Sequence, residues 1–284
     1  MRGFFCKDDD TQIDMTEKKI DIEKILKKKM PSLKKRLPKF VISYIERAIC
    51  QDEINRVYSK LGHLQGYDFA HALLQEEFNI KYNVIGKENL PKDSRVIFAC
   101  NHPLGGADGV IMIDILGATY PTLKIPVNDF LMNIDNLCIF FIPINKISGQ
   151  AKGTSQLLNE VCDSDDAILF FPSGQCSRRQ ENGEIKDNEW KKTFISKAIQ
   201  YQRDIIPIHF EGKNSKFFYN LAYYRKKLGI KVNIEMLYLP SELFKQRDKT
   251  FTIKIGQPIP YSTFDKSKTE KEWAQWVKEI TYSL

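Results

Sequence analysis

The stretch RVIFACNHPLGGADGVIMIDIL, residues 95–116, carries the clearest indication of the fold class. Its first part, VIFA, is a continuous apolar run of the kind found in strands that are buried on both faces. A polar loop containing two glycines, NHPLGGAD, follows at once, and an apolar run of helical length comes next. A strand, a loop and a helix in this order are half of a βαβ unit, so the stretch predicts an α/β fold with a parallel sheet.

The same alternation continues from about residue 81 to the end of the chain. Short apolar runs typical of strands are KYNVIG (81–86), CIFFIPI (138–144), AILFFPS (167–173), DIIPIHFEG (204–212), KVNIEML (231–237) and TFTIKIG (250–256). Helical patterns lie between or after them, at SQLLNEVCD (155–163), WKKTFISKAIQY (190–201), FFYNLAYYRKKLG (217–229) and TEKEWAQWVKEI (269–280). We therefore predict an α/β domain over residues 81–284, with a mostly parallel central sheet flanked by helices and functional loops at the carboxyl ends of its strands.

Residues 16–80 differ, because apolar residues recur there at helical spacing among many lysines, with breaks at Pro31 and Pro38. Between Lys18 and Lys39, ten basic residues stand against two acidic ones, a local excess of +8. Such an N-terminal helical region fits a solvated helix face, a platform for anionic membrane lipid, or a nucleic-acid surface. Residues 1–15 show no pattern, so we expect them to be disordered, and Met15 is an alternative start to Met1.

Composition narrows the possible functions. Hydrophobic residues at 42% and charged residues at 28% are ordinary for a folded domain, and the net charge of +7 favours a negatively charged partner. No apolar run approaches the roughly 20 residues that span a bilayer, so we expect a soluble or peripheral protein. The six cysteines are scattered without metal-ligand spacing, so no metal is predicted. Nucleic acid is disfavoured as a partner, because no helix-turn-helix, zinc-finger or RNA-binding pattern occurs.

The first chemical motif is CNHPLGGADGV, residues 100–110, at the carboxyl end of the predicted strand. Gly105 and Gly106 permit a tight turn, so that His102 and Asp108 can face each other across it. A carboxylate that holds an imidazole in one tautomer makes the imidazole a better general base. Alternatively, Asp108 caps the following helix and His102 is a structural hydrogen-bonding residue.

The second motif is PSGQCSRR, residues 172–179, which also follows a predicted strand. Gly174 bends the chain, and Ser177, Arg178 and Arg179 offer donors suited to a phosphate or carboxylate. The alternative is a polar turn capped by arginines. Ser173 and Cys176 lack the signatures of covalent nucleophiles.

The two motifs in this order resemble those of the glycerolipid acyltransferase superfamily, which carries an NH-x4-D block followed by an FPEG block. The match over residues 82–260 is nearest to the hemolysin-like branch of lysophospholipid and ornithine- or glycine-lipid O-acyltransferases. This sequence departs from the common pattern at two places: five residues separate His102 from Asp108, and Ser173 replaces the usual Glu. Lys146 stands near the position of an arginine in the family's second block.

The resemblance implies direct acyl transfer from acyl-CoA or acyl carrier protein, without a cofactor, to the hydroxyl of a lysolipid such as lysophosphatidic acid or a lyso-aminoacyl lipid. His102 would then be the general base and Asp108 its partner. The implied substrate-binding residues are Asn101, Gly105, Gly106, Lys146, Ser173, Gly174, Ser177, Arg178, Arg179 and Lys213. Membrane-resident substrates imply a peripheral protein that binds anionic lipid on the inner face of the cytoplasmic membrane.

Three further expectations stay open at this stage. The same His102–Asp108 pair could act on water or another acceptor, which would make the protein a hydrolase or transacylase. A lipid-binding, toxin-like protein without catalysis is the non-enzymatic alternative. His209 is expected to be a strand residue, and the aromatic residues at 217–224 either pack in the core or line an acyl tunnel.

Overall fold

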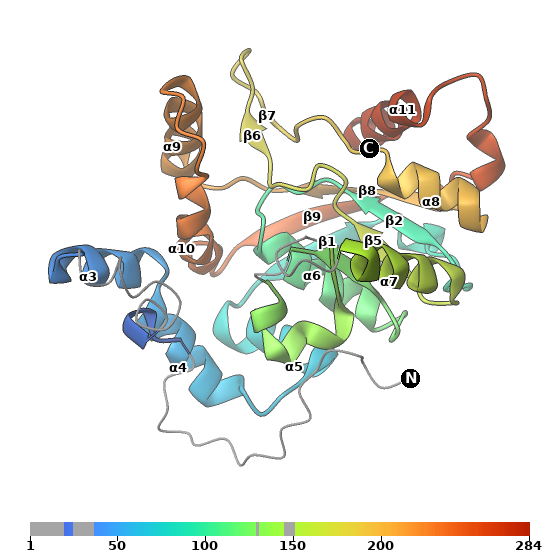
Figure 1. Ribbon diagram of the computed structural model, residues 1–284. Coiled ribbons are helices and arrows are strands. Elements are labelled where there is room, and N and C mark those ends of the chain that lie inside the picture. Colours follow the sequence, from blue (N-terminus) through green and yellow to red (C-terminus); the bar gives the residue numbers. More distant parts are fainter. Residues whose placement is uncertain (1–19, 25–36, 129–130, 145–150) are drawn as a thin grey trace.

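The computed structural model describes residues 20–24, 37–128, 131–144 and 151–284. Within these residues, a five-stranded sheet has the order β1-β9-β8-β2-β5 (Figure 1). All neighbouring strands are parallel except β8 and β9, which confirms the predicted mostly parallel sheet. The sheet strands are β1 (Lys81–Ile85), β2 (Ile97–Cys100), β5 (Ile168–Phe170), β8 (Ile205–Glu211) and β9 (Thr250–Ile255).

Two short strand pairs stand apart from this sheet. They are the parallel pair β3 (Ile125–Val127) and β4 (Phe141–Pro143), and the antiparallel hairpin β6 (Arg178–Arg179) and β7 (Ile185–Lys186). The hairpin begins with the last two residues of the second sequence motif and rises from the edge of the sheet (Figure 1).

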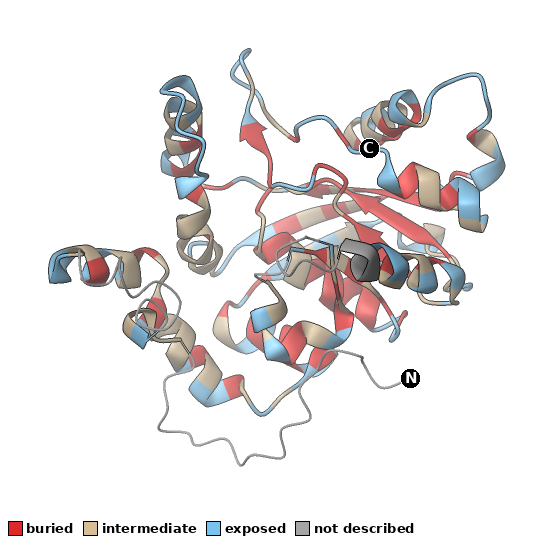
Figure 2. Ribbon diagram, in the orientation of Figure 1, coloured by how far each residue is buried: buried red, intermediate tan, exposed pale blue. Residues whose placement is uncertain are grey.

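Helices cover both faces of the sheet, as predicted. The helices of the described residues are α3 (Lys39–Ala48), α4 (Gln51–Leu61), α5 (Gly66–Ala72), α6 (Ala107–Gly117), α7 (Ala151–Asp163), α8 (Thr193–Tyr201), α9 (Lys216–Lys227), α10 (Leu239–Phe244) and α11 (Glu270–Ser283), with short turns at Leu73–Glu77, Lys87–Asn89, Leu131–Asn133, Asp135–Phe140, Ile234–Tyr238 and Tyr261–Thr263. Figure 2 shows the sheet buried throughout its centre, with the exposed positions on the outer sides of the helices.

The residues of β2 explain the two-sided burial. Phe98 and Cys100 belong to the core under α5 and α6, whereas Ile97 and Ala99 belong to the core under α7, α8 and α11. All four are fully buried, because alternate side chains of a central strand point to opposite faces. A continuous apolar run in the sequence is therefore the signature of this strand.

Two predicted strands are wrong in part or in full. Within CIFFIPI only Phe141–Pro143 is a strand, and the preceding residues belong to the 3₁₀ turn Asp135–Phe140. KVNIEML forms no strand: it contains η5, a 3₁₀ turn over Ile234–Tyr238. The reason is Glu235, whose fully buried carboxylate pairs with two arginines and fixes the chain in a turn.

The N-terminal region is helical where the structure describes it, and α3 begins directly after Pro38. Pro31 and most of the lysine-rich segment, residues 25–36, lie outside the described residues, as do residues 1–19. Among the helices that are described, none combines the length and the apolar character needed to cross a bilayer.

Candidate functional site

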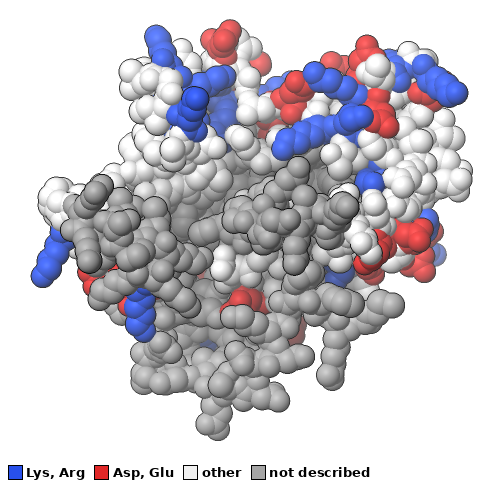
Figure 3. All heavy atoms as spheres, in the orientation of Figure 1, with Lys and Arg blue, Asp and Glu red and all other residues white. Residues whose placement is uncertain are grey.

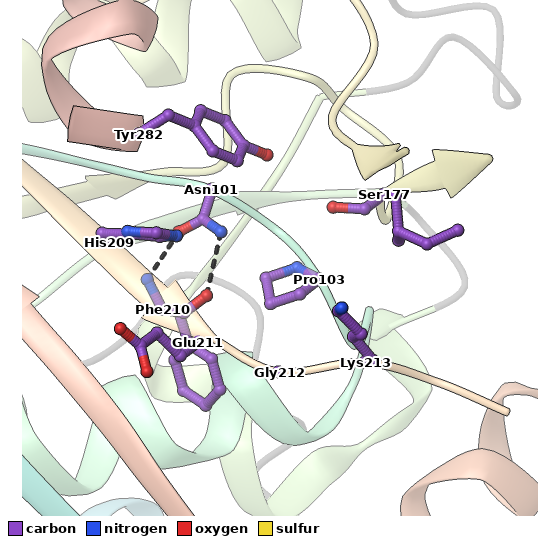
Figure 4. A pocket seen from close by; sticks show the side chains of 10 residues that line it. Asn101, Pro103, Ser177, His209, Phe210, Glu211, Gly212, Lys213 and Tyr282 are labelled. Atoms are coloured by element: carbon purple, nitrogen blue, oxygen red, sulfur yellow. Dashed lines mark hydrogen bonds between the residues drawn. The ribbon is translucent and has the colours of Figure 1, made fainter. Parts of the chain in front are cut away.

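The first motif begins with Asn101, which joins two strands at the carboxyl edge of the sheet. Its amide donates to the carbonyl oxygen of Phe210 at 3.0 Å and accepts from the Phe210 backbone N–H at 2.6 Å (Figure 4). Asn101 lies beside Tyr282 of α11 (Figure 4). The next side chain, His102, faces Asp108 of α6. Asn101 therefore fixes the loop to β8, and its predicted contact to a substrate stays a prediction.

His102 and Asp108 form the pair that the sequence predicts. Nδ1 of His102 lies 3.1 Å from Oδ2 of Asp108, whose side chain is completely buried. Asp108 is in the first turn of α6, which begins at Ala107, so Asp108 is not the helix cap. Its carboxylate also accepts from the backbone N–H groups of Leu104 and Gly105, at 2.9 and 3.2 Å.

Electrostatics set the protonation state of the pair. Burial opposes ionisation of Asp108, but the facing imidazole and the N–H donors together lower the pKa of its carboxyl. An ionised carboxylate only accepts, so Nδ1 of His102 carries the proton and Nε2 of the neutral ring is free to act as a base. Burial lowers and the Asp108 charge raises the pKa of His102, with a net rise above its ordinary value. The geometry is that of a held general base.

Gly105 is required by the turn. Its φ is +81°, and a Cβ atom there would lie 3.0 Å from Cβ of Cys176 and 3.1 Å from the side chain of Leu239. Because its N–H donates to Asp108, Gly105 helps to hold the carboxylate of the pair, and its predicted contact to a substrate stays a prediction. Gly106 precedes α6 and has open space around it.

A second carboxylate, Asp187, supports the same loop and was missed from the sequence. It is 1% exposed, and its oxygens accept from the His102 backbone N–H at 3.2 and 3.3 Å. The hydroxyl of Ser177 donates to it at 2.6 Å and the indole of Trp190 at 2.9 Å. These donors lower the pKa of Asp187, but burial outweighs them and raises it above its ordinary value. Asp187 therefore ties the two motif loops together beneath the base.

The second motif packs directly on the first. The backbone N–H of Ser177 donates to the carbonyl oxygen of His102 at 2.7 Å, and the ring of Phe171 lies 4.2 Å from the imidazole. Ser173 is buried and closes its own turn by donating to the carbonyl oxygen of Gln175. Gly174, with a φ of +67°, is exposed beside Lys191.

The two motif arginines have different surroundings. Arg178 is 8% exposed and donates to the carbonyl oxygen of Cys176 at 2.7 Å and to the carboxylate of Glu235 at 3.2 Å. Its guanidinium is thus paired inside the protein, and its predicted contact to a substrate stays a prediction. Arg179 is exposed and donates to Asn220 of α9 at 3.1 Å. Burial raises the pKa of the Cys176 thiol to about 11, which leaves it protonated and unsuited to nucleophilic attack.

A cavity of about 380 Å³ lies on the Tyr282 side of the same sheet edge (Figure 4). It is lined by Asn101, Pro103, Ser177, Ile185, His209, Phe210, Glu211, Gly212, Lys213 and Tyr282. His209 is a residue of β8, as predicted, and its Nδ1 is buried without a hydrogen-bond partner. Burial lowers the pKa of His209, so its ring is neutral.

The structure places the predicted site residues in different surroundings. Gly105 donates to Asp108 of the pair, whereas Asn101, Ser177 and Lys213 line the cavity. Arg178 and Arg179 point towards η5 and α9. Lys146 lies outside the described residues. Among the residues that are described, no cluster of three or more His, Cys, Asp or Glu side chains could hold a metal ion.

Two known proteins are similar to this sequence over nearly its whole length. A lyso-glycine lipid O-acyltransferase from Bacteroides thetaiotaomicron is 51% identical over 266 residues, covering 93% of this chain and 97% of the relative. The enzyme of the same name from Phocaeicola vulgatus is 50% identical over 266 residues, covering 93% and 95%. The crystal structure of the 1-acyl-sn-glycerophosphate acyltransferase PlsC from Thermotoga maritima is 15% identical, with a TM-score of 0.48 over 85% of this chain and 86% of that one. A family model described as acyltransferase matches residues 24–284, and with these two relatives it shows that the chain belongs to the acyltransferase family.

Proposed function

We propose that this acyltransferase moves a fatty acyl group from a thioester donor to the hydroxyl of a lyso-glycine lipid. The observation that carries the chemistry is the His102–Asp108 pair, in which a buried carboxylate at 3.1 Å fixes the tautomer of a base. The choice of acceptor is supported by the relatives of 51% and 50% identity, whose names state a lyso-glycine lipid.

The reaction follows from the orientation of the base. Nε2 of His102 accepts the proton of the acceptor hydroxyl while the hydroxyl oxygen attacks the thioester carbon. Asp108 stabilises the imidazolium that forms. The carbon–sulfur bond then breaks, and the thiolate of CoA or of an acyl carrier protein takes the proton from the imidazolium. No group of the protein becomes acylated, in keeping with the protonated thiol of Cys176.

The surroundings support an anionic acceptor at the surface of a membrane. Arg178 is paired with Glu235, whereas Lys213 is exposed and lines the cavity, so Lys213 is the cation that we assign to an acceptor carboxylate. The acceptor and the acyl product are both membrane lipids, so the protein works as a peripheral protein on the inner face of the cytoplasmic membrane.

The experiment is acyl transfer by the purified protein from long-chain acyl-CoA and acyl carrier protein to lyso-glycine lipid, lyso-ornithine lipid and lysophosphatidic acid. H102A should lose transfer by about 100- to 10,000-fold. H71A is the matched control, because His71 forms a second His–Asp pair, at 2.8 Å from Asp114, away from the motif loops. Transfer to lyso-glycine lipid that persists in H102A would refute the proposal, and free fatty acid without transfer would indicate a hydrolase.

A further inference from the structure

The end of α9 and the loop after it carry an unusual set of exposed apolar side chains. Residues 226–234, here called the α9 tip, include Leu228 at 74% exposure, Val232 at 69%, Ile230 at 42% and Ile234 at 39%. The tip stands at the far end of α9, away from the central sheet (Figure 1). Exposure of four aliphatic side chains close together in sequence is unfavourable in water. Such exposed apolar patches mark surfaces that bind a membrane or another apolar partner.

The charges of the α9 tip all have one sign. Lys226, Lys227 and Lys231 are exposed and interleaved with the aliphatic residues, and no acidic residue occurs between 226 and 234. None of the three lysines forms an ion pair with any residue that the structure describes. Figure 3 shows basic side chains projecting at the upper left, where α9 lies. Aliphatic residues interleaved with lysines suit a bilayer with anionic head groups. The aliphatic side chains can enter the hydrocarbon, and the lysines can bind the head groups.

The residue that follows the α9 tip connects this part of the chain to the second motif. This residue, Glu235, is completely buried between Arg178 of the second motif and Arg225 of α9, at 3.2 and 2.8 Å. The guanidinium of Arg178 also lies over the ring of Phe218 in α9, 5.1 Å from its centre. Arg178 begins the β6–β7 hairpin, and the preceding residue, Ser177, donates its backbone N–H to the carbonyl oxygen of His102. The α9 tip is therefore connected to the His102 loop through the second motif.

We propose that the α9 tip is a membrane-docking surface: Leu228, Ile230, Val232 and Ile234 insert among the acyl chains at the interface, and the three lysines bind anionic head groups. The purpose assigned to this docking rests on the proposed function, because it brings the sheet edge with His102 to a bilayer that holds the lysolipid acceptor. The lysine-rich residues 18–39 add to the attraction but lie in a separate segment of the chain.

The test is binding of the full chain to vesicles, measured by sedimentation. We expect L228S/V232S to bind phosphatidylglycerol-containing vesicles at least about tenfold more weakly, because each lost side chain forfeits its transfer into hydrocarbon. K226Q/K227Q/K231Q should bind them on the order of 100-fold more weakly, since each lysine contributes about a fivefold factor at an anionic surface. The same lysine variant should change little on pure phosphatidylcholine.

The matched control is I85S/I199S, which removes two aliphatic residues of 49% and 39% exposure from β1 and α8. These positions are exposed, so melting temperatures should be unchanged and binding should match the parent. H102A should bind vesicles like the parent, so a failure of the catalytic proposal would leave this result intact. Parent-like vesicle binding by L228S/V232S, or an equal loss in the control, would overturn the proposal and leave a protein partner for the tip.

Discussion

The Asp187 carboxylate offers the most informative single substitution, D187N. Asp187 does not touch the imidazole, but it receives the His102 backbone N–H, the Ser177 hydroxyl and the Trp190 indole N–H. Asparagine keeps the shape and loses the charge. The amide oxygen of the new side chain would accept from the His102 and Trp190 N–H groups. Its NH₂ group would face Ser177, whose hydroxyl can rotate and accept that hydrogen bond.

The expected loss of stability is modest. Hydrogen bonds to a charged group contribute about 1.5–3 kcal/mol and neutral ones about 0.5–1.5 kcal/mol, so three weakened bonds cost about 3 kcal/mol. Removal of a buried charge offsets part of this cost, because burial already raises the pKa of Asp187. We expect a net loss of about 1–2 kcal/mol, or a few degrees in Tm. D187A leaves three donors without an acceptor and should cost about 3–6 kcal/mol.

The charge of Asp187 also affects how the activity depends on pH. The base must be neutral, so activity falls as pH falls through the pKa of His102, which lies above its ordinary value. The Asp187 charge is one of the causes of that rise. D187N should therefore shift the acid limb of the kcat/KM profile to lower pH. A looser loop should also lower kcat by about 10- to 100-fold, because misplacement of a base by about 1 Å costs that much.

The assay is a pH profile of acyl transfer for the parent, D187N and S177A. S177A removes one donor to Asp187 but keeps its charge, so its acid limb should stay with that of the parent. If the acid limb of D187N does not move and activity falls only as far as the folded fraction falls, Asp187 has no electrostatic effect on His102 and is a packing residue.

Three further predictions concern the supports of the site. D108N can keep one acceptor for Nδ1 of His102 but loses the charge that stabilises the imidazolium, so kcat should fall about 100- to 10,000-fold in steady-state kinetics. G105A should lose about 1–3 kcal/mol in a denaturant titration, and more than G183A, because both glycines have positive φ but only Gly105 has close neighbours. E235Q removes one buried charge from between two arginines and should cost about 3–5 kcal/mol, visible as a lower Tm.

The His102–Asp108 pair could be predicted because the strand, the glycine turn and the helix that bring the two residues together are consecutive in the sequence. VIFA is continuous and apolar, so it marks a central strand, and the loop that follows a central parallel strand lies at the carboxyl edge. Asp108 lies six positions after His102, and a single glycine with φ of +81° turns the chain between them. Asp187 could not be found in this way, since it is one acidic residue in a polar stretch and meets His102 across 85 positions.

KVNIEML shows how an apolar pattern can mislead. Its alternation places Val232 and Ile234 on one side and Glu235 on the other, and a strand would bury the aliphatic side. In the structure the order is reversed, because Val232 is 69% exposed and Glu235 is completely buried. The cause is two arginines distant in sequence, whose charges make a buried carboxylate favourable at this point.

The position of Arg178 changes how the second motif is understood. An arginine in that motif suggests a contact to an anionic substrate, yet its guanidinium is buried between Cys176, Phe218 and Glu235. Its charge fixes α9 and η5 to the hairpin that begins directly after Ser177. Because Ser177 and Asp187 hold the His102 loop from the other side, the base and the α9 tip are joined through one set of buried polar contacts. Loss of Glu235 should consequently reduce vesicle binding and acyl transfer together, whereas loss of Asp187 should reduce transfer alone.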